Sequence, residues 1–265
     1  VSITALDDLG VPVGIESNGN EIRYNAVTTV SLSTLAPDQE SRAFGALIVV
    51  HAGADIIYNF GSVSTEGPNT DTSDTTFSSK AAIWTGTTTK EIYWDNNKNF
   101  PESSDEFFAQ GSMRGLAEKG GNLYGVGYNT VDGDGDLQDM NASVFVSNSL
   151  DISSATWTTK VISGAEVDSD GDYKYTNSVA TDINDNLFAV GYAKRNGYVP
   201  ESGSTGNKIF VVEDAANPEA TFLTGGIFFN GASGEAKAVN NFNEIVGQVD
   251  AETTREVDGS ERGHR

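Results

Sequence analysis

Short apolar segments alternate with polar turns along the chain, and no long segment has helical periodicity. The clearest case is a ten-residue phrase, residues 238–247, in which an apolar segment, a polar turn and a second segment ending in Val-Gly follow one another. Runs of valine, isoleucine, phenylalanine, tyrosine and threonine bounded by turn residues are typical of strands. The pattern therefore predicts an all-β protein.

The same phrase recurs in altered form, and its copies end at Gly14, Gly61, Gly127, Gly191 and Gly247. The intervals between these glycines are slightly longer than the roughly 40–50 residues of common propeller blades. We interpret the chain as a single repeat domain, 1–265, with units of approximately 1–40, 41–100, 101–163, 164–225 and 226–265. The recurrent glycine indicates a close approach of backbones, for which we expect a place near a central channel.

Each unit can be divided into four strands. In the fourth unit these are 177–183, 187–194, 208–212 and 220–223, and Asn184-Asp185-Asn186 forms the first turn. Asparagine and aspartate favour such tight hairpins because they tolerate left-handed backbone angles. The corresponding segments are 113–117, 123–128, 143–146 and 157–162 in the third unit, 46–50, 56–62, 80–84 and 91–94 in the second, and 3–6, 11–16, 21–26 and 28–32 in the first.

Four antiparallel strands repeated around an axis describe a β-propeller, and we expect a propeller-like array of about five units. A β-sandwich whose strands end in Val-Gly is the alternative. The fifth unit has segments 237–239 and 245–249 and reaches residue 265 where its third strand is due, so we expect an incomplete last unit. Continuation of the natural chain, closure by strand 1–6 and self-association through the open edge are the three expected explanations.

The phrase at 238–247, followed by a loop and a strand such as Lys80-Ala81-Ala82-Ile83-Trp84, resembles the bacterial HAF-repeat family of extracellular proteins. The resemblance covers most of the chain. It implies a propeller-like fold, a secreted or cell-surface location and no established activity. The chain begins at Val1, which we interpret as the result of signal-peptide removal, with a cloning boundary as the alternative.

The net charge of −22 argues against nucleic acid and anionic membranes as partners. It favours a chain that stays soluble in salt or binds cations. The sequence has no cysteine, which excludes disulfides and zinc-thiolate sites. No apolar run approaches the roughly 20 residues of a membrane-spanning helix.

Two acidic loops predict Ca²⁺ sites, because aspartates at alternate positions of a turning loop can direct carboxylate oxygens toward one point. The first contains Asp132, Asp134, Asp136 and Asp139. The second contains Asp168, Asp170 and Asp172. Neither fits an EF-hand, which requires glycine at the sixth position. A solvated acidic loop is the alternative for both, and it is the preferred interpretation of the loop at 71–74.

Catalysis has little support. The two histidines are His51, which we expect to be packed or at an edge, and His264, so a Ser/His/Asp triad is not expected. A glycoside hydrolase with two carboxylates near the propeller axis is the alternative function. The aromatic residues considered for a sugar groove, with core strands as the preferred location, are Tyr93, Trp94, Phe107, Phe108, Phe228 and Phe229. We expect a calcium-stabilised binding or structural module whose partners are polysaccharides or other surface proteins.

Overall fold

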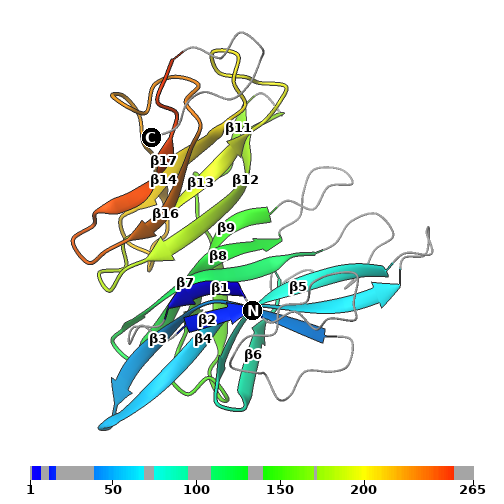
Figure 1. Ribbon diagram of the computed structural model, residues 1–265, viewed down its shortest axis with the longest axis vertical. Coiled ribbons are helices and arrows are strands. Elements are labelled where there is room, and N and C mark those ends of the chain that lie inside the picture. Colours follow the sequence, from blue (N-terminus) through cyan, green and yellow to red (C-terminus); the bar gives the residue numbers. More distant parts are fainter. Residues whose placement is uncertain are drawn as a thin grey trace.

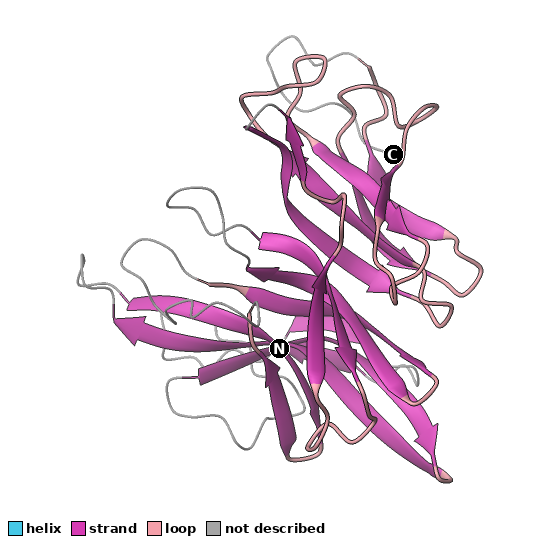
Figure 2. Ribbon diagram, turned by 180° about the vertical axis from the view of Figure 1, so that it is seen from behind, coloured by secondary structure: helices cyan, strands magenta, loops and turns pink. Residues whose placement is uncertain are grey.

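The computed structural model describes residues 2–6, 12–15, 39–68, 75–94, 109–130, 140–169 and 172–253. Every regular element in these segments is a strand, and none of them contains a helix (Figure 2). The strands form antiparallel sheets only. The all-β prediction is therefore confirmed for this part of the chain.

Five sheets follow one another along the sequence, and each is built from strands that are consecutive in the chain. The first sheet pairs β1 (Ser2–Leu6) with β2 (Pro12–Ile15). The second has the order β3-β4-β5-β6, with bounds Gln39–His51, Ala54–Pro68, Thr75–Thr85 and Thr88–Ile92. The third is β7-β8-β9-β10, with bounds Gly111–Lys119, Asn122–Thr130, Met140–Ser147 and Trp157–Val161.

The fourth sheet has five strands instead of the predicted four. Its order is β11-β12-β13-β14-β15, with bounds Val167–Ser169, Asp172–Ile183, Ala189–Arg195, Asn207–Val212 and Ala220–Phe222. The fifth sheet pairs β16 (Gly234–Val239) with β17 (Ile245–Val249). The predicted strands at 21–26 and 28–32 and the segment 262–265 lie outside the described residues.

Sheets that are consecutive along the chain contact one another, and the fourth and fifth sheets lie together at one end of the molecule (Figure 1). β1 and β2 contact β3; β7 packs against β3, β4 and β5; β12 packs against β7, β8 and β9; and β16 packs against β12, β13 and β14. In the last three contacts, one strand (β7, β12 or β16) thus lies on the face of the preceding sheet. We call β1, β3, β7, β12 and β16 the leading strands, because each forms a hairpin with the strand that carries the closing glycine. Consecutive units cover one another's apolar faces, as expected for a repeat protein.

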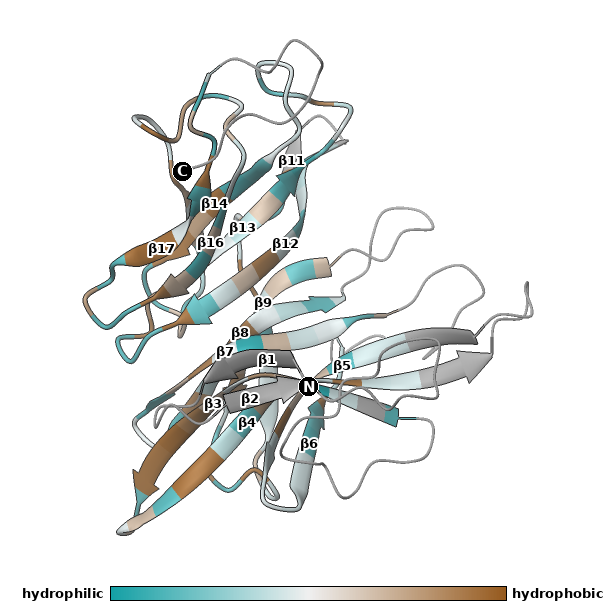
Figure 3. Ribbon diagram, viewed as in Figure 1, coloured by the Kyte–Doolittle hydropathy of each residue, from teal (hydrophilic) through white to brown (hydrophobic). Residues whose placement is uncertain are grey.

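The hydrophobic core is divided among the layers, and apolar residues (brown in Figure 3) lie on strands of successive sheets. One cluster joins the second and third sheets through Tyr58, Ile83 and Phe145. Another joins the third and fourth sheets through Val144 and Phe210. Tyr58, Phe145 and Phe210 are almost completely buried. Full burial of a large apolar side chain contributes about 1.5–3 kcal/mol to the stability of the fold.

The repeated phrase forms the same hairpin turn in the fourth and fifth sheets. The side-chain oxygen of Asn184 accepts hydrogen bonds from the amides of Asn186 and Phe188. That of Asn240 accepts hydrogen bonds from the amides of Phe242 and Glu244, at the same offsets. Positive φ angles fall three residues after each asparagine, at Leu187 (67°) and Asn243 (61°). The predicted turn exists, but its left-handed residue in the fourth unit is a leucine.

The two turns are also bonded to each other. Asn184 donates through Nδ2 to the carbonyl oxygen of Asn240 at 2.8 Å and to Oδ1 of Asn243 at 2.7 Å. Asn241 donates through Nδ2 to Oδ2 of Asp185 at 2.6 Å. The asparagines of the phrase therefore set the turn within each unit and join neighbouring units.

The five glycines occupy equivalent positions, which confirms the prediction from the repeat. Each is paired with the residue that immediately precedes a register shift in the leading strand; the pairs are Ile3–Gly14, Ala43–Gly61, Met113–Gly127, Ala180–Gly191 and Ala236–Gly247. A Cβ atom on the last four glycines would lie 1.8–2.3 Å from a carbonyl oxygen of the paired strand. The backbone approach is thus inside each sheet, opposite a β-bulge, and it leaves no room for a side chain.

Candidate functional site

The β-bulge of each leading strand leaves one residue without a partner in the sheet. A bulge re-aims the side chain of its extra residue and is common beside functional sites. In every sheet one such extra residue directly follows the residue that is paired with the closing glycine; these residues are Thr4, Phe44, Arg114, Thr181 and Lys237. The fourth sheet has further register shifts, between Val167 and Asp168 and between Thr176 and Val179. Of the five extra residues beside the closing glycines, the last four line one cavity.

This cavity, which we name the axial cavity because it lies between the leading strands of four consecutive sheets, has a volume of about 570 Å³. Its other described lining residues come from β8, β9, β12 and β13 and from the segment before β7; they are Gln110, Tyr128, Met140, Asn177, Ser178, Val179 and Tyr192. Arg114 and Lys237 carry positive charge, and no Asp or Glu is among the described residues of the lining. A basic cavity is unexpected in a chain with a net charge of −22.

The guanidinium group of Arg114 is held between aromatic rings. Its central carbon lies 3.8 Å from the ring centroid of Phe44 and 5.4 Å from that of Tyr128, both within the range of cation–π contacts. Its Nε atom is buried and has no hydrogen-bond partner among the described residues. The aromatic rings thus fix the side chain of Arg114 without satisfying this donor.

Lys237 is placed more openly. Its ammonium nitrogen lies 6.0 Å from the ring centroid of Tyr192 and 2.5 Å from Oε2 of Glu235. Its side chain is 55% exposed. Burial raises the pKa of Tyr192, and the nearby carboxylate of Glu235 adds to this, against smaller opposing effects of Lys237 and Arg114. Tyr192 therefore stays protonated at neutral pH and keeps an O–H donor beside the cavity.

A buried carboxyl group joins the fourth and fifth sheets next to the bulge. Asp182 follows the extra residue Thr181 and accepts hydrogen bonds from the amides of Ile183 (2.9 Å) and Val239 (2.8 Å). Burial raises the pKa of Asp182, and the two amide hydrogen bonds oppose that effect. Oδ2 thus joins the two sheets, and Oδ1 is bonded by the amide of the next residue within β12.

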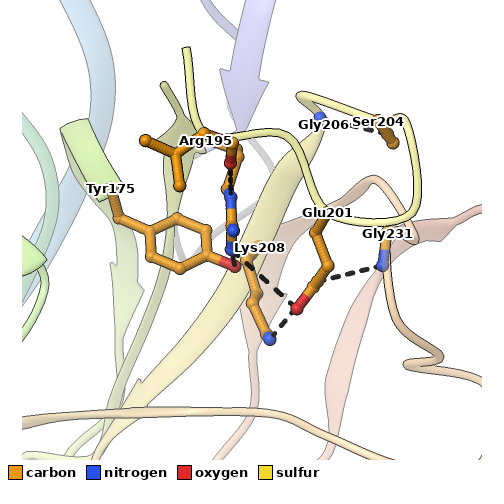
Figure 4. Close-up of polar contacts among 8 residues, drawn as sticks. Tyr175, Arg195, Glu201, Ser204, Gly206, Lys208 and Gly231 are labelled. Atoms are coloured by element: carbon orange, nitrogen blue, oxygen red, sulfur yellow. Dashed lines mark hydrogen bonds and ion pairs between the residues drawn. The ribbon is translucent and has the colours of Figure 1, made fainter. Parts of the chain in front are cut away.

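A separate polar cluster orders the connection between β13 and β14 (Figure 4). Arg195 donates from Nη1 to the hydroxyl of Tyr175 at 2.8 Å and from Nε to the carbonyl oxygen of Val199. Oε1 of Glu201 lies 3.8 Å from Nη1 of Arg195, and its Oε2 lies 3.9 Å from Nζ of Lys208. Oε2 also accepts a hydrogen bond from the amide of Gly231 at 2.9 Å. The carboxylate of Glu201 therefore pairs with two cations and binds the backbone of a second loop at Gly231, which indicates a structural role.

Two of the seven predicted calcium residues, Asp168 and Asp172, lie within the described residues. Asp132, Asp134, Asp136 and Asp139 lie outside the described residues, in the connection from β8 to β9. Asp170 also lies outside them. The backbone of Asp168 is in β11, paired with Tyr173, and that of Asp172 is in β12, paired with Ser169. Part of the second acidic segment therefore belongs to paired strands and not to the predicted loop.

Within the segments that the structure describes, no group of three or more His, Cys, Asp or Glu side chains could hold a metal ion. The loop at 71–74 and residues 107, 108 and 264 are outside these segments. His51 is exposed at the end of β3, consistent with the expected edge position. Trp94 is buried, Tyr93 is 65% exposed, and Phe228 packs against a core cluster. None of these three lines the axial cavity.

The aromatic and basic residues of the axial cavity were not singled out from the sequence. A signal for them exists, because Thr4, Thr181 and Lys237 each precede the closing glycine of their unit by ten residues, and Tyr128 and Tyr192 directly follow one. In the second and third units the hairpins are longer, so Phe44 and Arg114 lie more than ten residues before their closing glycines. Their equivalence to Thr4, Thr181 and Lys237 therefore cannot be found from sequence spacing. Only the register of the sheets brings these positions together.

The fold and cavity define a class of repeated antiparallel β-sheet proteins with a basic, aromatic site between the sheets. A model of the family described as "Protein of unknown function (DUF3466)" matches residues 59–265. The chain belongs to this DUF3466 family. No curated protein matched the chain, and no solved structure matched it. The described residues contain no helix that is long and apolar enough to cross a membrane.

Proposed function

We propose that this protein is a propeller-like binding module, secreted or held at the bacterial cell surface, that acts without catalysis. The observation that carries the proposal is the convergence of one equivalent residue from each of four consecutive sheets on a single cavity. Repetition of a sheet around an axis brings equivalent positions together in this way. The HAF-repeat resemblance of the repeated phrase supports the same arrangement and location.

The competing proposal is a polysaccharide-active glycoside hydrolase. Such enzymes use two carboxyl groups separated by about 5–10 Å on either side of the scissile bond. The described lining of the axial cavity supplies cations, amides and hydroxyls instead. The neighbouring carboxyl group of Asp182 is engaged by two backbone amides. These observations favour binding over hydrolysis.

Calcium completes the proposal as a stabilising ion. We assign it first to Asp132, Asp134, Asp136 and Asp139, which offer the hard oxygen ligands that Ca²⁺ prefers. Asp168, Asp170 and Asp172 are the second candidate set. The first set lies in the connection between Thr130 and Met140, which are paired at the ends of β8 and β9. A bound cation there would hold that connection together next to a residue, Met140, that lines the axial cavity.

Two measurements on the same protein sample test the function. The protein is applied to an array of acidic and neutral bacterial polysaccharides, and the same polysaccharides are incubated with it and assayed for new reducing ends. We expect retention on at least one polysaccharide with no release of reducing ends. Release of reducing ends would favour the hydrolase, and an absence of retention would contradict the binding module.

A further inference from the structure

We infer that the axial cavity binds a small acidic sugar, with the sugar carboxylate held by Arg114 and Lys237. The inference rests on the proposed binding function and names the ligand class of its site. It follows from three properties of the cavity: the sign of its charge, the geometry of its arginine and the number of its uncommitted polar groups.

The charge points to an anion. The chain carries 38 acidic and 16 basic residues, yet the described lining of the cavity holds two cations and no carboxylate. Lys237 has a partner in Glu235, whereas Arg114 makes no ion pair with any described residue. A buried donor without a partner is unfavourable, and an oxyanion that enters the cavity would supply one. The negative remainder of the surface would repel anions elsewhere, which makes the site selective.

The geometry favours a carboxylate. The central carbon of the Arg114 guanidinium group lies 3.8 Å from the ring centroid of Phe44 and 5.4 Å from that of Tyr128. A guanidinium group that stacks its faces on aromatic rings keeps its N–H groups at the edges for hydrogen bonds. Two parallel N–H groups at such an edge match the two oxygens of a carboxylate. Because the rings hold the guanidinium in place before binding, little side-chain freedom is lost when the anion arrives.

The remaining polar groups favour a sugar over a simple anion. The side-chain amides of Gln110 and Asn177 and the hydroxyls of Tyr128 and Tyr192 have no hydrogen-bond partner among the described residues. They could bond to the hydroxyl groups of a sugar ring. The volume of about 570 Å³ is within the range of roughly 300–1,000 Å³ of small-molecule sites, and inorganic phosphate would leave most of it empty.

Isothermal titration calorimetry with three probes tests the inference: D-glucuronate, D-glucose as its uncharged analogue, and inorganic phosphate. We expect D-glucuronate to bind the wild-type protein with an affinity at least about tenfold above those of the other two, since the charge-assisted hydrogen bonds require a carboxylate and the remaining groups require the ring. Binding should weaken as salt is added.

Three variants locate the binding. Arg114→Gln and Lys237→Gln should each weaken D-glucuronate binding by about tenfold or more. Lys194→Gln, an exposed lysine of β13 outside the cavity, removes the same charge and should leave the affinity unchanged. If Arg114→Gln does not fold, as judged by circular dichroism, the mostly exposed Lys237 carries the test.

Four results would overturn the inference: no binding of D-glucuronate, equal binding of D-glucose, phosphate binding as tight as that of D-glucuronate, or unchanged affinity in Arg114→Gln and Lys237→Gln. These results differ from failure of the proposed function. A polysaccharide array that retains the wild-type protein and the Arg114→Gln variant equally would leave a binding module whose site is elsewhere.

Discussion

Replacement of a closing glycine by alanine tests the bulge geometry that directs residues into the axial cavity. In Gly127→Ala the new Cβ would lie 1.9 Å from the carbonyl oxygen of Ser112 and 3.1 Å from Cα of Met113. Ordinary non-bonded contact needs about 3.5 Å, so the strands would have to separate by roughly 1.5 Å. Since both obstructing atoms belong to the backbone, no side chain can rotate away to relieve the overlap. We expect a loss of about 3 kcal/mol in the free energy of unfolding, at the upper end of typical overpacking costs.

The assay is urea unfolding followed by circular dichroism, with Gly197→Ala as the matched control. A Cβ on Gly197 would have nothing within 4 Å, and its φ angle is not in the left-handed region. That substitution should change stability by no more than about 0.5 kcal/mol. If Gly127→Ala is within about 1 kcal/mol of the control, the close approach at the bulge is wrong.

Three further predictions concern charged groups. Saturating calcium should raise the melting temperature by about 5–10 °C relative to chelator, because a hundredfold excess over Kd adds about 2.7 kcal/mol to the free energy of unfolding. The double variant Asp132→Asn, Asp134→Asn should abolish the rise. Identical melting temperatures of the wild-type protein with calcium and with chelator would refute the calcium site. Burial raises the pKa of Asp182 above its unfolded value near 3.9, so the folded state binds more protons and this carboxyl group makes stability fall as pH rises through that window. The stability of wild type relative to Asp182→Asn should therefore decrease from pH 4 to 7, and a constant or increasing difference would contradict the assignment. Glu201→Gln should lower the free energy of unfolding by about 1–2 kcal/mol, because it leaves two cations uncompensated at a partly exposed site. The control Glu213→Gln, at an exposed position, should change it by close to zero in the same unfolding assay. Equal effects of the two substitutions would contradict a structural role of the cluster.

The alternation of apolar segments and polar turn residues was enough to predict most strands of the second, third and fourth sheets. The Asn184 turn and its copy at Asn240 are specified by neighbouring residues, since each asparagine bonds to amides two and four positions ahead. The equivalence of the closing glycines was also predictable, because a position that cannot accept a Cβ must be glycine in every copy. Strand β11 was missed because the acidic residues around Asp170 were interpreted as a metal-binding loop, whereas the described backbone pairs Ser169 with Asp172.

The axial cavity depended on information that the sequence pattern does not contain. A bulge adds one residue to a strand without a distinctive residue type, and the extra residues are as different as phenylalanine, arginine, threonine and lysine. The basic character of the site comes from Arg114 and Lys237, which lie in different sheets. Their convergence is a consequence of how the sheets stack, and composition alone indicated only a strongly acidic molecule.

The most direct test of that convergence is a cross-link between residues of non-consecutive sheets. The chain has no cysteine, so Phe44→Cys with Lys237→Cys introduces one pair that a short bis-maleimide reagent can join. The control pair is Phe44→Cys with Phe242→Cys, because Phe242 is 86% exposed at the last hairpin turn and does not line the cavity. We predict an intramolecular cross-link, seen as the mass of one reagent on the monomer with no free thiol left, for the first pair and not for the control. Equal cross-linking of both pairs, or of neither, would contradict the axial cavity.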